Sequence, residues 1–164
     1  EYDFHIEDEN MKTCFGEDDT NNENYYAWNK PVFSPCEGIV SRIKNNTKDN
    51  TPRNNPSNPG LNNGVWINTI DGHEAVIVDF KKKGVVVNVG DKVSKGDLLG
   101  YTGNSGSSWQ PHIHFVIRSK EYPEGIPLIF ENVKVGINPF NDDPWVRELD
   151  RWVAREDYFI ENNN

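Results

Sequence analysis

The fold is decided by one stretch, Gly100-Tyr-Thr-Gly-Asn-Ser-Gly-Ser-Ser-Trp-Gln-Pro-His-Ile-His-Phe115, which opens with a turn rich in glycine and serine. Strand side chains alternate between two faces, so His112 and His114 project from the same face, roughly 6–7 Å apart at their backbones. Ile113 and Phe115 take the opposite, apolar face. Two imidazoles on one face suit one metal ligand and one catalytic partner. A bare His-x-His pair is more often an ordinary part of a strand, so the neighbouring residues decide between these interpretations.

Two further motifs lie upstream of this stretch. Residues 89–106 read Val-Gly-Asp-Lys-Val-Ser-Lys-Gly-Asp-Leu-Leu-Gly-Tyr-Thr-Gly-Asn-Ser-Gly, and residues 30–40 read Lys-Pro-Val-Phe-Ser-Pro-Cys-Glu-Gly-Ile-Val. Together with the closing Pro111-His-Ile-His-Phe115, these motifs resemble the M23 family of zinc metallopeptidases. That family comprises the lysostaphin- and LytM-like endopeptidases that cut peptide bridges in bacterial cell walls. The resemblance covers about residues 1–118.

Alternating apolar residues predict a domain that is mainly antiparallel β-sheet. The runs 65–70 and 74–80 alternate on either side of Asp71-Gly72, and this arrangement is a strong hairpin signal. Residues 1–6 alternate in the same way and predict a half-buried strand. Together with the resemblance, which implies the fold of the family, this predicts an antiparallel-sheet, LytM/M23-like β domain.

Two segments interrupt this pattern. Residues 44–63 form a long polar loop, for which disorder, a lid and a wall of a substrate groove all remain open. Near the end of the chain, apolar residues recur at helical spacing after Asp143-Pro144, which predicts an amphipathic helix over about 144–157. We expect residues 1–140 to form the peptidase-like β domain, and residues 141–164 to add a helix and tail to that same domain.

The resemblance implies a metal site with two ligands in this sequence. In the family, zinc is held by the His and Asp of an early His-x-x-x-Asp motif and by the second His of His-x-His. His114 matches that second His, and His112 matches the first, which is catalytic and does not bind the metal. Tyr2-Asp3-Phe4 resembles the end of the early motif, so Asp3 is expected to be the second metal ligand. The His partner of Asp3 would lie before position 1; it was lost upstream, never existed in this member, or is replaced by His5.

A second departure from the family concerns the catalytic base. Counting back from the glycine-aspartate hairpin, the position of another catalytic His of the family falls on Asp79. His73 is the nearest histidine, but it lies at the hairpin turn. A carboxylate could act as a base or as a further metal ligand, yet an ionised carboxylate cannot donate a hydrogen bond to an oxyanion. We therefore expect Asp79 and His112 as the catalytic residues of a weakened or inactive site.

The glycine-rich turn is expected to lie beside the site. The residues predicted to contact substrate are Asn104, Ser105, Ser107 and Trp109. The alternative for the first three is only to form a tight turn, and for Trp109 it is burial.

Composition and charge restrict the classes of partner. The net charge of −9 argues against nucleic acid, which requires a basic surface, and no apolar run approaches the roughly 20 residues of a membrane span. The opening residues read as a strand and not as a signal peptide. A location in the periplasm, in the cell envelope or outside the cell follows from the resemblance alone. Cys14 and Cys36 could form a disulfide or remain free thiols.

The predicted function is a zinc metalloendopeptidase domain directed at peptidoglycan peptides, stem or cross-bridge, with weak or absent activity. The alternative is a catalytically dead M23-like domain that binds a peptide, or a protein partner through the C-terminal helix. A third class, a biotinyl- or lipoyl-type carrier, also fits the hairpin at residues 89–99. Such carriers present a lysine in a Met-Lys-Met-like turn, and this sequence has none.

Overall fold

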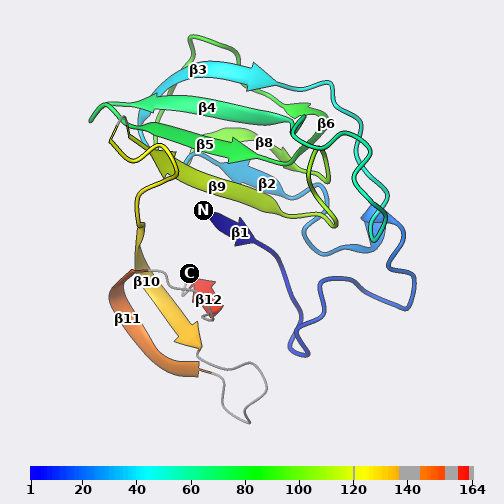
Figure 1. Cartoon of the computed structure of the whole chain (residues 1–164). Coiled ribbons are helices and arrows are strands. Elements are labelled where there is room, and N and C mark those ends of the chain that lie inside the picture. Colours follow the sequence, from blue (N-terminus) through cyan, green and yellow to red (C-terminus); the bar gives the residue numbers. More distant parts are fainter. Residues whose placement is uncertain (120, 137–144, 154–158, 163–164) are drawn as a thin grey trace. The chain divides into compact units, whose positions relative to one another are not determined.

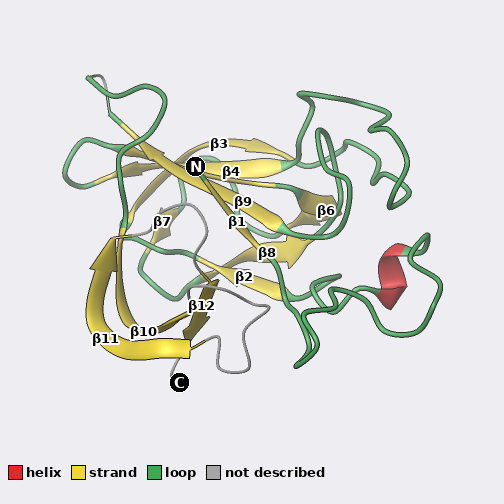
Figure 2. Ribbon diagram, turned by 60° about the horizontal axis from the view of Figure 1, so that its bottom comes forward, coloured by secondary structure: helices red, strands yellow, loops and turns green. Residues whose placement is uncertain are grey.

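The computed structural model describes residues 1–119, 121–136, 145–153 and 159–162. Contacts divide the chain into two compact units, Glu1–Gly125 and Ile126–Asn164, which are described separately (Figure 1). Strands are the main regular elements of both units, joined in the first unit by long loops, and the single helical element described is a short 3-10 turn, η1 (Asn22–Asn24) (Figure 2). The predicted mainly antiparallel β fold is confirmed.

The first unit contains a six-stranded sheet whose neighbours are all antiparallel. Its order is β1-β9-β5-β4-β3-β7. The strands are β1 (Tyr2–Phe4), β9 (Ile113–Arg118), β5 (Glu74–Val78), β4 (Gly64–Thr69), β3 (Gly38–Lys44) and β7 (Lys92–Val93). The predicted hairpin is β4–β5, and its turn includes Gly72 at a φ of 85°, a conformation that glycine adopts readily.

A second, three-stranded sheet has the order β2-β8-β6 and lies behind the larger sheet in Figure 1. Its strands are β2 (Pro31–Phe33), β8 (Leu98–Thr102) and β6 (Phe80–Val85). The chain passes from one sheet to the other at Asp79, which lies between β5 and β6. This corner places Asp79 where the two sheets meet.

The two faces of the large sheet have different environments. Alternate residues on one face are buried core residues, and they include Val65, Ile67, Ala75, Ile77 and Phe115. The side chains between them in sequence belong to the opposite face, which carries His114. Strand alternation therefore separates the hydrophobic core from the face that bears the predicted site.

The second unit is a three-stranded antiparallel sheet. Its order is β11-β10-β12, formed by β10 (Ile129–Gly136), β11 (Trp145–Val153) and β12 (Phe159–Asn162).

The helix predicted over 144–157 is wrong for residues 145–153, which form β11; its remaining residues lie outside those described. The apolar spacing of these residues follows the helical period, but pairing with the β-branched-rich β10 makes the segment a strand. A protein partner was predicted to bind this helix, and the structure does not support that prediction, because residues 145–153 form a strand. That residues 141–164 belong to one domain with residues 1–140 stays a prediction.

Candidate functional site

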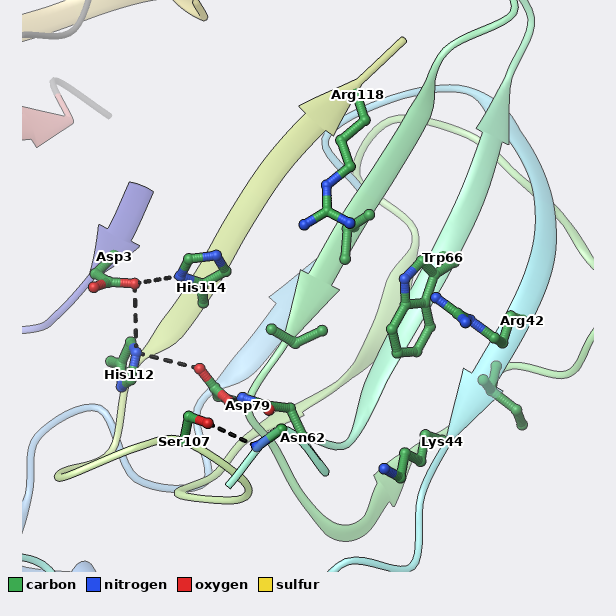
Figure 3. Close-up of a pocket in the computed structure, with 14 residues that line it drawn as sticks. Asp3, Arg42, Lys44, Asn62, Trp66, Asp79, Ser107, His112, His114 and Arg118 are labelled. Carbon is green, nitrogen blue, oxygen red and sulfur yellow. Dashed lines mark hydrogen bonds and ion pairs between the residues drawn. The ribbon is translucent and has the colours of Figure 1, made fainter. Parts of the chain in front are cut away.

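Three strands bring the four predicted metal and catalytic residues together. Strand β9 lies between β1 and β5, and its His114 is opposite both Asp3 of β1 and Val78 of β5. Asp79 follows Val78 directly, and His112 comes just before β9. Residues far apart in sequence therefore meet at one end of a pocket (Figure 3).

The four side chains form a chain of alternating carboxylates and imidazoles. Asp3 Oδ1 is 2.7 Å from His114 Nδ1 and 3.5 Å from His112 Nε2. His112 Nε2 is in turn 3.2 Å from Asp79 Oδ2. The hydrogen bonds from His112 and His114 hold the pKa of Asp3 well below its usual range. Asp3 is therefore an ionised acceptor shared by the two histidines.

The hydrogen bonds of His112 fix where its protons lie. Its Nδ1 is 2.9 Å from the carbonyl oxygen of Gln110, and a carbonyl can only accept, so Nδ1 carries a proton. Its Nε2 faces carboxylate oxygens of both Asp79 and Asp3, at 3.2 and 3.5 Å, so the two carboxylates together favour a second proton on Nε2. Burial lowers the pKa of His112, but the hydrogen bond to Asp3 and the charge of Asp79 outweigh it and raise that pKa. Burial also raises the pKa of Asp79.

The backbone at Asp79 holds its side chain inside the molecule. Its φ is 78°, a left-handed conformation that aspartate tolerates better than most residues, and the side chain is 2% exposed. The amide of Asp79 donates to the carbonyl of Asn63, and its carbonyl accepts from the amide of Gly103, both at 2.9 Å. Asn62 Nδ2 donates to Asp79 Oδ1. These contacts leave Oδ2 to face His112.

Asp79→Asn should remove the second proton of His112 and preserve the fold. The asparagine oxygen can accept from Asn62, and its amide can donate to a neutral His112 Nε2, so every buried polar group keeps a partner. We expect the pKa of His112 to fall, because the Asp79 charge no longer stabilises the imidazolium. NMR titration of the histidine rings measures this shift. His73, which pairs with Asp71 at 2.9 Å in the hairpin turn, is the internal control. An unchanged His112 pKa would contradict the ion pair between His112 and Asp79.

The predicted ligands Asp3 and His114 meet only part of what zinc requires. A catalytic zinc takes three protein ligands, and two ligands at about 2.0–2.1 Å from the ion lie about 3.3 Å apart. Asp3 and His114 are 2.7 Å apart, as hydrogen-bonded partners. The His5 ring stacks on His112 at 5.2 Å and its Nδ1 contacts Gln110, so His5 does not complete a ligand set. In the ranges described, no group of three or more ligating side chains could hold an ion. Asp3 and His114, the two predicted zinc ligands, are thus arranged as hydrogen-bonded partners, and the described residues do not form a complete zinc site.

The pocket has a volume of about 590 Å³ and extends across the sheet from the histidines. Its other lining residues are Arg42, Ile43, Lys44, Gly60, Asn62, Trp66, Val76, Val78, Ser107 and Arg118. Sequence reasoning missed Asn62, Trp66 and the cations. The alternation of β4 could have placed Trp66 on the face opposite the buried Ile67; the others depend on long-range pairing.

The residues predicted to contact substrate are divided by the structure. Asn104 and Ser105 are fully buried, and they hold the turn by hydrogen bonds to Asn22 and to the Phe80 carbonyl. In the structure they support the loop and do not reach the pocket. Ser107 lines the pocket, and its hydroxyl accepts from the Gly60 amide at 2.7 Å. Trp109 is 54% exposed and lies outside the pocket lining.

The long polar loop is ordered and forms a pocket wall. Residues 45–63 connect β3 to β4, and Gly60 and Asn62 line the pocket. Asn50 ties the loop to the glycine-rich turn by donating to the carbonyls of Gly106 and Ser108 at 2.9 and 3.0 Å. Of the alternatives left open by the sequence, the groove wall describes this loop and disorder does not.

The match to known proteins agrees with this architecture. The family model described as Peptidase family M23 matches residues 24–125, which is more than half of the chain. The chain therefore belongs to peptidase family M23.

No helix in the described ranges is long and apolar enough to cross a membrane, and Cys14 and Cys36 are free thiols.

Solved structures similar to this one include M23 and lysostaphin domains. The catalytic domain of the prophage-encoded M23 protein EnpA from Enterococcus faecalis is 21% identical, with a TM-score of 0.45 over 70% of this chain and 82% of that one. The catalytic domain of lysostaphin from Staphylococcus simulans is 19% identical, with a TM-score of 0.43 over 72% and 77%. A putative glycyl-glycine endopeptidase lytM from Ruminococcus gnavus is 24% identical, with a TM-score of 0.42 over 68% and 39%.

Proposed function

We propose that this M23 domain acts on peptides of bacterial peptidoglycan, outside the cytoplasm, and that Asp79 makes its hydrolysis slow. The proposal rests on one observation: Asp79 Oδ2 lies 3.2 Å from His112 Nε2. The resemblance in sequence implies that Asp79 stands where the family has a catalytic histidine. Asp3 and His114 are the proposed zinc ligands, and a third ligand would have to come from outside the described residues. The proposed catalytic residues are His112 and Asp79.

The chemistry of Asp79 explains the expected weakness. Nδ1 of His112 faces the Gln110 carbonyl, so only Nε2 could donate a proton to the oxygen of a peptide carbonyl. That nitrogen already faces the carboxylates of Asp79 and Asp3. An ionised carboxylate also cannot replace a hydrogen-bond donor to a developing oxyanion. Loss of one such donor typically lowers the rate by about 10²–10³-fold. Asp79 could still accept a proton as a base.

A binding domain without hydrolysis is the second candidate. The observation in its favour is the two-ligand set, since no group of three ligating side chains occurs in the part of the chain that the structure describes. Under this candidate the pocket still binds cell-wall peptide, and the peptide bond is not hydrolysed.

Peptide release from purified peptidoglycan, measured together with zinc content, tests the proposal. We expect slow release that depends on added zinc, its loss in His114→Ala, and a rate about 10²-fold higher in Asp79→His. Lys95→Gln, at an exposed turn residue outside the pocket lining, is the control. Release that survives in His114→Ala would contradict the proposed ligand. If the protein binds peptidoglycan, but no variant contains zinc and none releases peptide, the second candidate is favoured.

A further inference from the structure

The part of the pocket wall that lies away from the histidines is cationic. Arg42 and Lys44 come from β3, and Arg118 lies at the end of β9 (Figure 3). The whole chain has 26 acidic residues against 17 basic ones, so this grouping of cations runs against its composition. The pocket's carboxylates, Asp3 and Asp79, are both at the histidine end. The pocket is therefore polarised, negative at one end and positive at the other.

The register of the sheet sets this arrangement. One row across the sheet joins Lys44, Gly64, Val78 and His114, because each is opposite the next. Four residues beyond His114 on the same strand, Arg118 also faces this side. The β3 cations and the site histidine therefore share one face of the sheet.

A bulge in β3 brings the cations to that face. Val40 is opposite Ile67 and buried in the core, and the register shifts between Val40 and Arg42 so that Arg42 is opposite Trp66. Without the extra residue, Arg42 would lie on the core face with Val40. The inserted residue is Ser41, whose hydroxyl donates to the carbonyl of Trp66 at 3.1 Å. The bulge thus directs two cations into the pocket.

These cations have unused binding capacity. The Arg42 guanidinium lies over the Trp66 ring, 3.9 Å from its centroid, and in the described part of the chain neither Arg42 nor Lys44 makes an ion pair. Arg118 has one long contact, 3.7 Å to Glu1. Its Nε atom is buried without a hydrogen-bond partner among the described residues. The Arg118 side chain as a whole is 39% exposed, so its guanidinium can still be reached, and a guanidinium binds a carboxylate through charge-assisted hydrogen bonds.

We propose that this wall is a subsite for a carboxylate of the bound peptide, so that the domain selects acidic peptides. The inference rests on the proposed function and adds the substrate class. Trp66, stacked under Arg42, and the valines of β5 form an apolar floor for the peptide backbone.

The polarity of the pocket excludes a uniform polyanion, because Asp3 and Asp79 would repel one at the histidine end. Lys44 is three strands from His114, roughly 14 Å at the backbones, and Arg118 is roughly 13 Å along β9. An extended peptide advances roughly 3.3 Å per residue. The acidic residue of the peptide should therefore lie within about four residues of the peptide residue that contacts His112.

Isothermal titration calorimetry with two matched peptides tests this subsite. The peptides are acetyl-Gly-Gly-Glu-Gly-Gly-amide and its glutamine counterpart, and EDTA in the buffer removes any contribution from metal. We expect the glutamate peptide to bind about tenfold more tightly, and added salt to reduce that preference. The double variant Arg42→Gln/Lys44→Gln should lose the preference, as should Arg118→Gln. Lys95→Gln should keep it.

Several outcomes would overturn the subsite. These are equal affinities, no binding of either peptide, or a preference that survives in the double variant. Inorganic phosphate that displaces the glutamate peptide at concentrations where acetate does not would replace carboxylate by phosphate as the ligand. Hydrolysis is measured separately, as peptide release from peptidoglycan with added zinc. A glutamate preference in EDTA together with no release in that assay would leave the subsite standing and reject only the catalytic part of the proposed function. Hydrolysis without a preference would reject the subsite alone.

Discussion

Gly103→Ala should be among the most damaging single substitutions in this protein, lowering the free energy of unfolding by about 3 kcal/mol. A Cβ at this position would collide with the backbone of Lys81 and Phe80 at closer range than real Cβ atoms reach, and backbone cannot move aside as a side chain can. The Gly103 amide also donates to the Asp79 carbonyl, and Gly103 forms a β-bridge with His112. The site should therefore be displaced together with the fold. Chemical denaturation measures the loss of stability.

Gly72→Ala is the matched control for Gly103→Ala. Gly72 has a φ of 85° but no atom within 4 Å of an added Cβ, so only backbone strain should result, about 1 kcal/mol. Equal losses for the two variants would show that the close approach at Gly103 contributes nothing. The NMR signals of His112 should shift in Gly103→Ala and remain unchanged in Gly72→Ala, because only Gly103 contacts the site.

Asn50→Ala should be the second large effect, about 2–4 kcal/mol of unfolding free energy. The buried Asn50 amide donates to the carbonyls of Gly106 and Ser108, and its oxygen accepts from the Ser57 amide at 3.0 Å. Alanine leaves these three backbone groups without their partner. Because the same loop contributes Gly60 to the pocket wall, peptide affinity should fall as well. Thermal unfolding and calorimetry measure the two effects.

Asn55→Ala provides the control within the same loop. Asn55 is exposed and makes no hydrogen bond through its side chain in the described part of the chain, so the change should stay within about 0.5 kcal/mol. A loss in Asn50→Ala no greater than this would mean that the loop does not depend on the buried amide.

Local alternation was enough to predict the central part of the fold and of the site. The hairpin β4–β5 follows from apolar alternation around Asp71-Gly72, and the shared face of His112 and His114 follows from their spacing. The placement of Asp3 beside His114 required the family motif, because nothing near Asp3 in sequence indicates its partner. The structure joins the two at 2.7 Å.

What sequence reasoning missed depends on long-range register and pairing. Arg42 reaches the pocket only because β3 contains a bulge, and alternation counted without that bulge places it in the core. The loop 45–63 is ordered by Asn50 through contacts with residues more than fifty positions away. For residues 145–153 the apolar spacing favours a helix, and the strand is set by pairing with β10, which the spacing does not show. None of these determinants is local.

Strand β1 has a consequence for the integrity of the site. It has three residues, has β9 as its one partner among the described strands, and contributes Asp3, which contacts both histidines. Detachment of β1 would therefore remove Asp3, the acceptor that both histidines share. It would also leave the β9 backbone unpaired on the side where β1 lay. An unpaired edge is a template for strands from other chains. Loss of the site and the onset of self-association would then be one structural event.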